Sequence, residues 1–221
     1  MIPLRDTLQL RRTPVVNRAI LIAIAVSFVA QFLFGDGATR LINIFGFIPA
    51  RFFDPSRFHY TAYETIFTLI SSLFLHGGMV HVAGNMIYLW IFGDDVEDRL
   101  GRLEYLVFFL ACGAVGSLTH ALLYPQSSVP SIGASGSIAG ILGAFLVLHP
   151  KARIVTLIPL VVSWALVEIP VLVFLPVWFG LQFMNGFLAL ASARGVQEVA
   201  GVAWWAHIGG FAFGVVVGLW F

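Results

Sequence analysis

The feature that most constrains this chain is a series of long apolar stretches. Six of them run over residues 19–34, 79–93, 103–123, 136–149, 170–191 and 203–221. A helix needs about 20 apolar residues to cross the hydrocarbon core of a bilayer, and the second and fourth stretches are short for that. Only 10% of the 221 residues are charged, against about 25% in a typical soluble domain. The sequence therefore predicts an all-α integral membrane protein, a bundle of six transmembrane helices.

The distribution of positive charge predicts how the bundle is oriented. Six spans place both termini on one side, and that side carries eight of the twelve basic residues: Arg5, Arg11, Arg12, Arg18, Arg99, Arg102, Lys151 and Arg153. Because basic loops remain in the cytoplasm, we expect both termini there. Residues 1–16 are then a short cytoplasmic arm, residues 17–221 are the membrane core, and the absence of an organelle-type presequence favours a bacterial inner membrane.

The loop between the first two spans has an unusual composition. Residues 35–78 form a long outer loop that contains the aromatic-rich segment FGFIPARFF. Such a segment is expected to lie in the membrane interface.

Composition also bears on partners and cofactors. The net charge is +1, and no basic run with interleaved aromatic residues indicates a nucleic-acid partner. No histidine and cysteine spacing is typical of a metal site, so we expect no cofactor. The partners that remain are the lipid bilayer and other membrane proteins.

Polar residues inside apolar spans are costly, so each is a functional hypothesis. His81 and Asn85 are four residues apart in the second span and share one helix face. Ser135 begins the fourth span, and His207 lies about one turn into the sixth. In the predicted topology, all four lie near the outer ends of their spans and can meet at one depth.

These residue types together indicate serine nucleophile chemistry. A serine hydroxyl becomes a nucleophile when a base, usually histidine, removes its proton. The oxyanion that forms needs hydrogen-bond donors, which His81, Asn85 and the N–H groups at the start of the Ser135 helix would supply. Gly133 and Gly136 would allow the tight turn that exposes the serine.

The sequence predicts a catalytic dyad, because the acids nearest His207 in the sequence, Glu168 and Glu198, do not lie in the middle of a span. The same residues also allow structural interpretations. Gly136-x-x-x-Gly140 is a common helix-packing pattern, and buried histidines often serve as hydrogen-bonded structure. A channel or transporter and a haem protein with histidine ligands are further alternatives. We expect Gly210 and Gly214 to pack against Gly136 and Gly140, which would bring Ser135 to His207.

Four segments, in this order, carry a resemblance to a known family: HGGMVHVAGNM (76–86), GDDVEDRLG (93–101), GASGSIAG (133–140) and AHIGGFAFG (206–214). Together they resemble the rhomboid family of intramembrane serine proteases. The resemblance covers the whole predicted core and implies cleavage of single-span membrane proteins within or beside their transmembrane segment. By motif position, it makes Ser135 the nucleophile in place of Ser137, and His207 the base.

The resemblance implies roles for other residues as well. His81 and Asn85 match a pair that helps to bind the oxyanion, His76 matches a position that supports the entry to the second span, and Glu97 and Arg99 match a structural element at the cytoplasmic end. An inactive rhomboid-like protein that binds membrane clients is the alternative.

Two places depart from the family pattern. Phe67 and Thr68 stand where some members have a Trp-Arg pair, and Ala139 stands where some have an aromatic residue that packs on the base. We therefore expect Trp204 or Trp205 to buttress His207 instead.

Overall fold

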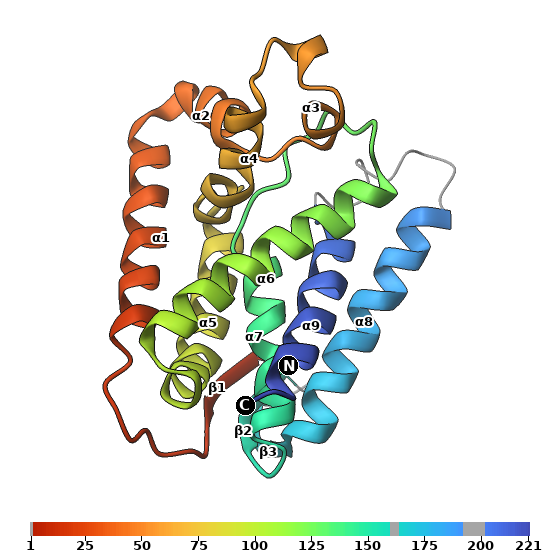
Figure 1. Ribbon diagram of the computed structural model, residues 1–221. Coiled ribbons are helices and arrows are strands. Elements are labelled where there is room, and N and C mark those ends of the chain that lie inside the picture. The colour runs from red at the N-terminus through yellow and green to blue at the C-terminus, as the bar shows by residue number, and fades with distance from the viewer. Residues whose placement is uncertain (1, 160–163, 192–201) are drawn as a thin grey trace.

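The computed structural model describes residues 2–159, 164–191 and 202–221 and is a helical bundle with a small sheet at one end (Figure 1). The helices are α1 (Val15–Leu33), α2 (Ala38–Phe45), α3 (Pro49–Phe53), α4 (Ala62–Ser71), α5 (Met79–Leu100), α6 (Arg102–Leu123), α7 (Ser135–Leu148), α8 (Val171–Ala191) and α9 (Trp204–Gly218). Short 3₁₀ turns η1 (Gly35–Gly37), η2 (Ser56–Phe58) and η3 (Ser72–Phe74) lie between them, and the strands are β1 (Ile2–Asp6), β2 (Arg153–Pro159) and β3 (Trp164–Pro170).

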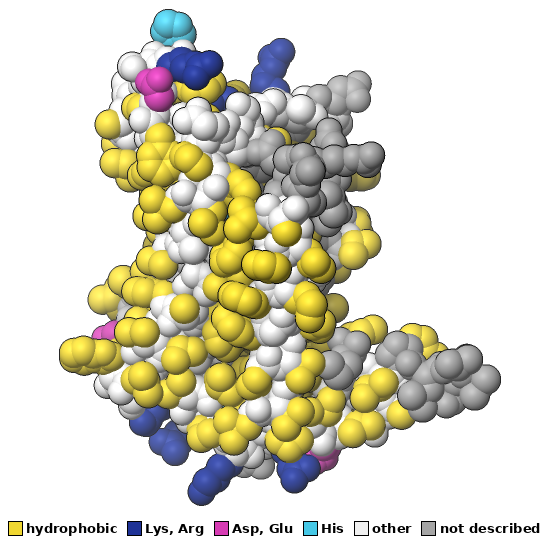
Figure 2. Space-filling view, turned by 90° about the vertical axis from the view of Figure 1, so that its right-hand side faces the viewer, with side chains coloured by type: hydrophobic (Ala, Val, Ile, Leu, Met, Phe, Trp, Pro, Cys, Tyr) yellow, Lys and Arg dark blue, Asp and Glu magenta, His cyan; other side chains and the backbone are white. Residues whose placement is uncertain are grey.

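The helices have the length and composition of a membrane bundle, which confirms the predicted fold class. Among the described residues, α1, α6 and α8 are each long and apolar enough to span a bilayer, α4 with η3 and α5 form a pair bent by 83°, and α7 and α9 are shorter apolar helices. Figure 2 shows hydrophobic side chains over the middle of one face, with Lys and Arg toward its two ends. The number of six spans remains a prediction.

Helix α7 is at the centre of the bundle. Ten of its residues, Gly136–Phe145, are buried, and it packs against α5, α6, α8 and α9 (Figure 1). Phe145 meets Phe92 of α5 edge to face, with ring centroids 5.0 Å apart. This central position places Ser135, the first residue of α7, among side chains from the surrounding helices.

Glycines bring α7 and α9 into backbone contact. A Cβ atom on Gly210 would overlap the carbonyl oxygen of Gly136, and one on Gly214 would overlap the carbonyl oxygen of Gly140. The two helices thus meet along the glycine edge that the spacing predicts. Because neither edge carries side chains, the first turn of α9 lies close to the start of α7.

The small sheet differs from what the sequence led us to expect. The sequence predicts a short arm over residues 1–16 and a helical membrane core over residues 17–221, but β1, β2 and β3 form an antiparallel sheet in that order. Ile2 pairs with Leu157, and Arg153 pairs with Pro170. RIVTLIP is rich in β-branched residues and WALVEIP contains Trp, Val and Ile, which are residue types that favour strands, and both segments end in proline, which stops a strand. Helix α1 begins at Val15, two residues before the expected start of the core, and α8 begins at Val171, directly after Pro170.

One end of the bundle is fixed by a carboxylate and a guanidinium. The Glu97 carboxylate accepts hydrogen bonds from the N–H groups of Val16 at 3.0 Å and Asn17 at 2.6 Å, and so caps the start of α1. Arg99 donates from Nη2 to the carbonyl oxygen of Phe221 at 2.6 Å. The start of α1, the end of α5 and the end of α9 therefore meet at the same end of the bundle.

The predicted long outer loop consists of the short helices α2, α3 and α4 with their connecting turns, at the opposite end of the bundle (Figure 1). Phe47, which is fully buried, exchanges two backbone hydrogen bonds with Ser131, at 3.2 and 2.7 Å. This bridge holds the segment that leads into α7. The placement of the loop in a membrane interface remains a prediction.

Candidate active site

A cavity of about 940 Å³ lies where α5, α6, α7, α8 and α9 converge. Its lining includes the four polar residues that the sequence places at one depth: His81, Asn85, Ser135 and His207. Residues far apart in the chain thus line the same cavity.

Ser135 and His207 are in direct contact inside this cavity. The Ser135 hydroxyl is hydrogen-bonded to Nε2 of His207, with Oγ and Nε2 2.8 Å apart. Ser135 begins α7, and the N-cap residue Ala134 has no side-chain oxygen to accept from the first-turn N–H groups. The hydroxyl therefore lies beside backbone donors at the positive end of a helix.

The second serine of the motif faces elsewhere. Ser137 is fully buried and does not line the cavity. Its hydroxyl lies against Gly113 of α6, where an added Cβ atom would overlap it. Of the two serines, Ser135 alone reaches both the cavity and His207.

Gly133 brings the backbone before Ser135 close to His81 and Asn85. Its φ angle is +113°, in the region that favours glycine. A Cβ atom at this position would lie 2.8 Å from Nε2 of His81 and 3.5 Å from Nδ2 of Asn85. Both side-chain nitrogens therefore face the chain two residues before the serine, where no larger residue fits.

His76 lies behind Asn85. Nδ2 of Asn85 donates to Nε2 of His76 at 2.8 Å, and since an amide nitrogen carries two hydrogens, one remains for the cavity. Gln31 of α1 holds the backbone of His76, accepting from its N–H at 3.0 Å and donating to its carbonyl oxygen at 3.2 Å. The sequence pointed to His76 only through the family resemblance and did not indicate Gln31.

Helices α8 and α9 surround the His207 ring. Trp204 contacts it at a centroid distance of 6.0 Å, as expected for one of the two tryptophans, while Trp205 packs on Phe183 instead. Trp178 of α8 lies 6.2 Å from the ring. His207 is only 8% exposed.

The second ring nitrogen of His207 also has a partner, which the sequence did not indicate. Nδ1 hydrogen-bonds to Oε1 of Gln182 on α8 at 2.9 Å. Among the described residues, no carboxylate bonds to His207: Glu168 lies in β3, and Glu198 falls outside the described residues. Gln182 is a polar residue inside an apolar span, the same signal that singled out His81 and Asn85.

The other residues predicted to support the site lie in different places. Gly136, Gly210 and Gly214 form the α7–α9 contact, whereas Glu97 and Arg99 lie at the opposite end of the bundle, away from the cavity. Within the part of the chain that the structure describes, no cluster of three or more histidine, cysteine or acidic residues has the geometry of a metal site.

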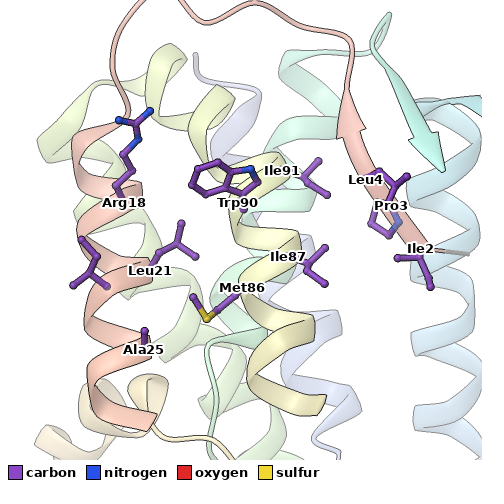
Figure 3. Close-up of a pocket in the computed structure, with 11 residues that line it drawn as sticks. Ile2, Pro3, Leu4, Arg18, Leu21, Ala25, Met86, Ile87, Trp90 and Ile91 are labelled. Atoms are coloured by element: carbon purple, nitrogen blue, oxygen red, sulfur yellow. The ribbon is translucent and has the colours of Figure 1, made fainter. Parts of the chain in front are cut away.

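A second cavity, of about 870 Å³, lies between β1, α1 and α5 (Figure 3). Its lining side chains are apolar except for Arg18, which lies at one end of it on α1. None of the predicted site residues lines this cavity.

The sequence of this chain matches a known protein family. The family model of the rhomboid domain matches residues 63–221. The chain belongs to the rhomboid family. Among relatives of this rhomboid, RHOMBOID-like protein 4 of Arabidopsis thaliana is 31% identical over 150 residues, which is 68% of this chain and 32% of the relative. Family membership makes the helical bundle a membrane domain.

Relatives of this rhomboid differ in what their names say they do. The rhomboid protease GluP of Bacillus subtilis is 41% identical over 78 residues, 35% of this chain and 15% of the relative. Inactive rhomboid protein 1 of Drosophila melanogaster is 30% identical over 85 residues, 38% of this chain and 6% of the relative. The chain thus spans a third or less of the length of these relatives.

The comparisons support a membrane location but not the bacterial inner membrane in particular. Relatives include mitochondrial rhomboids of Saccharomyces cerevisiae and Arabidopsis thaliana. The family therefore occupies several membranes, and membership does not select among them.

Proposed function

We propose that this rhomboid is an intramembrane serine endopeptidase that cleaves single-span membrane proteins within or next to their transmembrane segment. The observation that carries the proposal is the hydrogen bond between Ser135 Oγ and His207 Nε2, which are 2.8 Å apart, inside a cavity of about 940 Å³. A serine in contact with a free imidazole nitrogen is the arrangement that activates a hydroxyl for attack on a carbonyl carbon.

The geometry supports a two-step hydrolysis. As Ser135 Oγ bonds to the carbonyl carbon of the substrate, its proton passes to Nε2 of His207. The protonated His207 then gives this proton to the leaving amine as the C–N bond breaks, which leaves an acyl-enzyme. Water attacks the ester in the second step, with His207 again taking the proton and returning it to Ser135.

The oxyanion of each tetrahedral intermediate would lie near Gly133. His81 Nε2 and Asn85 Nδ2 both face this residue, and the first-turn N–H groups of α7 are close by. Donors that are already in place before the reaction stabilise the developing charge without reorganisation. We assign His81 and Asn85 to this role, and His76 to holding Asn85.

A transmembrane substrate must change shape to react. A helix buries its peptide groups in its own hydrogen bonds, so the scissile peptide has to leave the helix before it can enter the cavity. Glycine and proline lower helix stability. We therefore expect substrates with such residues near the end of the span that meets the cavity.

The proposed orientation of the protein places the reaction on one side of the membrane. Ser135 is at the end of α7 that is remote from the sheet, whereas α1 begins and α9 ends near Glu97 and Arg99. With both termini in the cytoplasm, as the basic residues indicate, cleavage takes place in the outer half of the membrane.

The proposal is tested with a fluorescent fluorophosphonate probe and a single-span substrate in proteoliposomes. We expect the wild type to be labelled and to cleave the substrate, and the Ser135→Ala variant to do neither. Ser137→Ala is the matched control and keeps both activities, because its hydroxyl lies outside the cavity. A folded wild-type protein that neither reacts with the probe nor cleaves would instead favour a client-binding rhomboid without activity.

A further inference from the structure

His207 is held at both ring nitrogens. Nε2 lies 2.8 Å from Oγ of Ser135, and Nδ1 lies 2.9 Å from Oε1 of Gln182. An amide oxygen can only accept a hydrogen bond, so with Oε1 facing the ring, the ring carries its proton on Nδ1. A neutral imidazole protonated at Nδ1 leaves Nε2 free to take the proton of the serine. The contact with Gln182 thus selects the tautomer that the proposed reaction needs.

Helix α8 brings Gln182 to His207 because α8 packs against α9 on both sides of this residue. Trp178, one turn before Gln182, lies 6.2 Å from both His207 and Phe211, and Phe179 stacks on Phe211 at 4.6 Å. One turn after Gln182, a Cβ atom on Gly186 would lie 3.3 Å from Cβ of Trp204. Close packing on both sides therefore fixes the position of the amide relative to the ring.

We propose that Gln182 is the positioning residue of the dyad: its amide oxygen orients the His207 ring and keeps the proton on Nδ1. The inference rests on the proposed protease function. In soluble serine proteases, a carboxylate performs this task and also stabilises the imidazolium. A neutral amide supplies orientation and tautomer choice without placing another charge inside the membrane, where an unpaired charge is costly.

The opposite orientation of the amide makes a distinguishable prediction. With its nitrogen toward the ring, Gln182 would donate to Nδ1, and the ring proton would move to Nε2. His207 would then donate to Ser135 and could not act as a base. Determining which ring nitrogen of His207 carries the proton therefore distinguishes a positioning role of Gln182 from a merely structural contact.

The first test compares kinetics for three variants in proteoliposomes. Gln182→Met keeps the size of the side chain but not the acceptor, Gln182→Glu keeps an acceptor, and Met184→Leu changes an exposed neighbour on the same helix. We expect Gln182→Met to lower kcat by about a hundredfold with little change in KM, since a small misplacement of a catalytic group has this effect. Met184→Leu should match the wild type.

Gln182→Glu tests the role of Gln182 through the pH profile of kcat/KM, which would not shift if the side chain only supported the structure. A carboxylate at Nδ1 keeps the tautomer and stabilises the protonated ring, so we expect turnover within about tenfold of the wild type. The acid limb of the kcat/KM profile should move to higher pH, and the rate of fluorophosphonate labelling should follow the same profile.

Nitrogen NMR of ¹⁵N-histidine-labelled protein tests the tautomer without turnover, with the His207 signals identified from their loss in His207→Ala. We expect protonated Nδ1 in the wild type, and Gln182→Met to release the ring to the Nε2–H form. Protonated Nε2 in an active wild type, or full turnover and an unchanged pH profile in both Gln182 variants, would overturn the role of Gln182 while leaving the protease proposal intact. A wild type that neither cleaves nor labels would overturn both.

Discussion

The two cavities of this rhomboid have similar volumes, about 940 and 870 Å³, but very different linings. The first gathers Ser135, His207, His81, Asn85 and Gln182 from α5, α7, α8 and α9. The described lining of the second carries a single charged residue, Arg18, at one end of an otherwise apolar surface (Figure 3). Size therefore does not identify the site. The convergence of polar groups from separate helices identifies it.

The difference has an energetic origin. Burying a polar group in an apolar medium is unfavourable unless it is hydrogen-bonded, and in the first cavity Ser135, His207, Gln182 and Asn85 all have protein partners. The second cavity opens among exposed apolar side chains such as Ile22 and Trp90, which are 64% and 59% exposed. Surfaces of that kind are typical of contact with lipid chains.

The largest expected effect comes from removing His207, the proposed base in the first cavity. Replacing His207 by alanine removes the group that activates Ser135, and we expect turnover to fall by about 10⁶-fold, as for the loss of a catalytic histidine in a soluble serine protease. Cleavage of a single-span substrate in proteoliposomes measures it. Substantial cleavage by this variant would contradict the assignment of the active site to the first cavity.

A change remote from the reacting atoms tests whether helix contact creates the first cavity. A valine at position 210 would overlap the carbonyl oxygen of Gly136 and push α9 away from α7. We expect Gly210→Val to lower turnover by about a thousandfold or more, because Ser135 and His207 separate.

The matched control for this helix contact is Gly180→Ala. Nothing lies within 4 Å of a Cβ atom at Gly180, so turnover should be unchanged. Equal activities of the two glycine variants would show that close α7–α9 contact is not needed.

The next largest loss of turnover is expected when a donor to the oxyanion is removed. Asn85→Ala removes the Nδ2 donor that faces Gly133, and we expect kcat to fall by about a hundredfold, with binding of the substrate little changed. Steady-state kinetics with a fluorogenic transmembrane peptide separate kcat from KM. A rise in KM at constant kcat would instead assign Asn85 to substrate binding.

The smallest effect is expected in the apolar cavity. Trp90→Leu changes one of its exposed walls without touching a polar contact, and turnover should stay within about twofold, since exposed substitutions away from such contacts change little. The same cleavage assay in vesicles of the same lipid provides the measurement. A large loss of turnover would mean that the second cavity contributes to catalysis.

Much of the site can be predicted from the sequence because a polar residue in an apolar span is costly wherever the helix packs. This local property singled out Ser135, His207, His81 and Asn85. The same property applies to Gln182, yet an amide in a span does not reveal which neighbour it bonds. The choice between Ser135 and Ser137 came from the family resemblance, and the packing of α6 against Ser137 supplies a physical reason for it.

The sequence by itself determined that the chain forms apolar helices, which polar residues interrupt them, and which glycines allow close contact. These are properties of single residues and their spacing. The tertiary structure alone decided that Gln182 meets His207, that Asn85 bonds to His76, and that residues 2–6 pair with residues 154–157. Such pairings depend on how helices rotate about their axes and on contacts between distant segments, which no local pattern specifies.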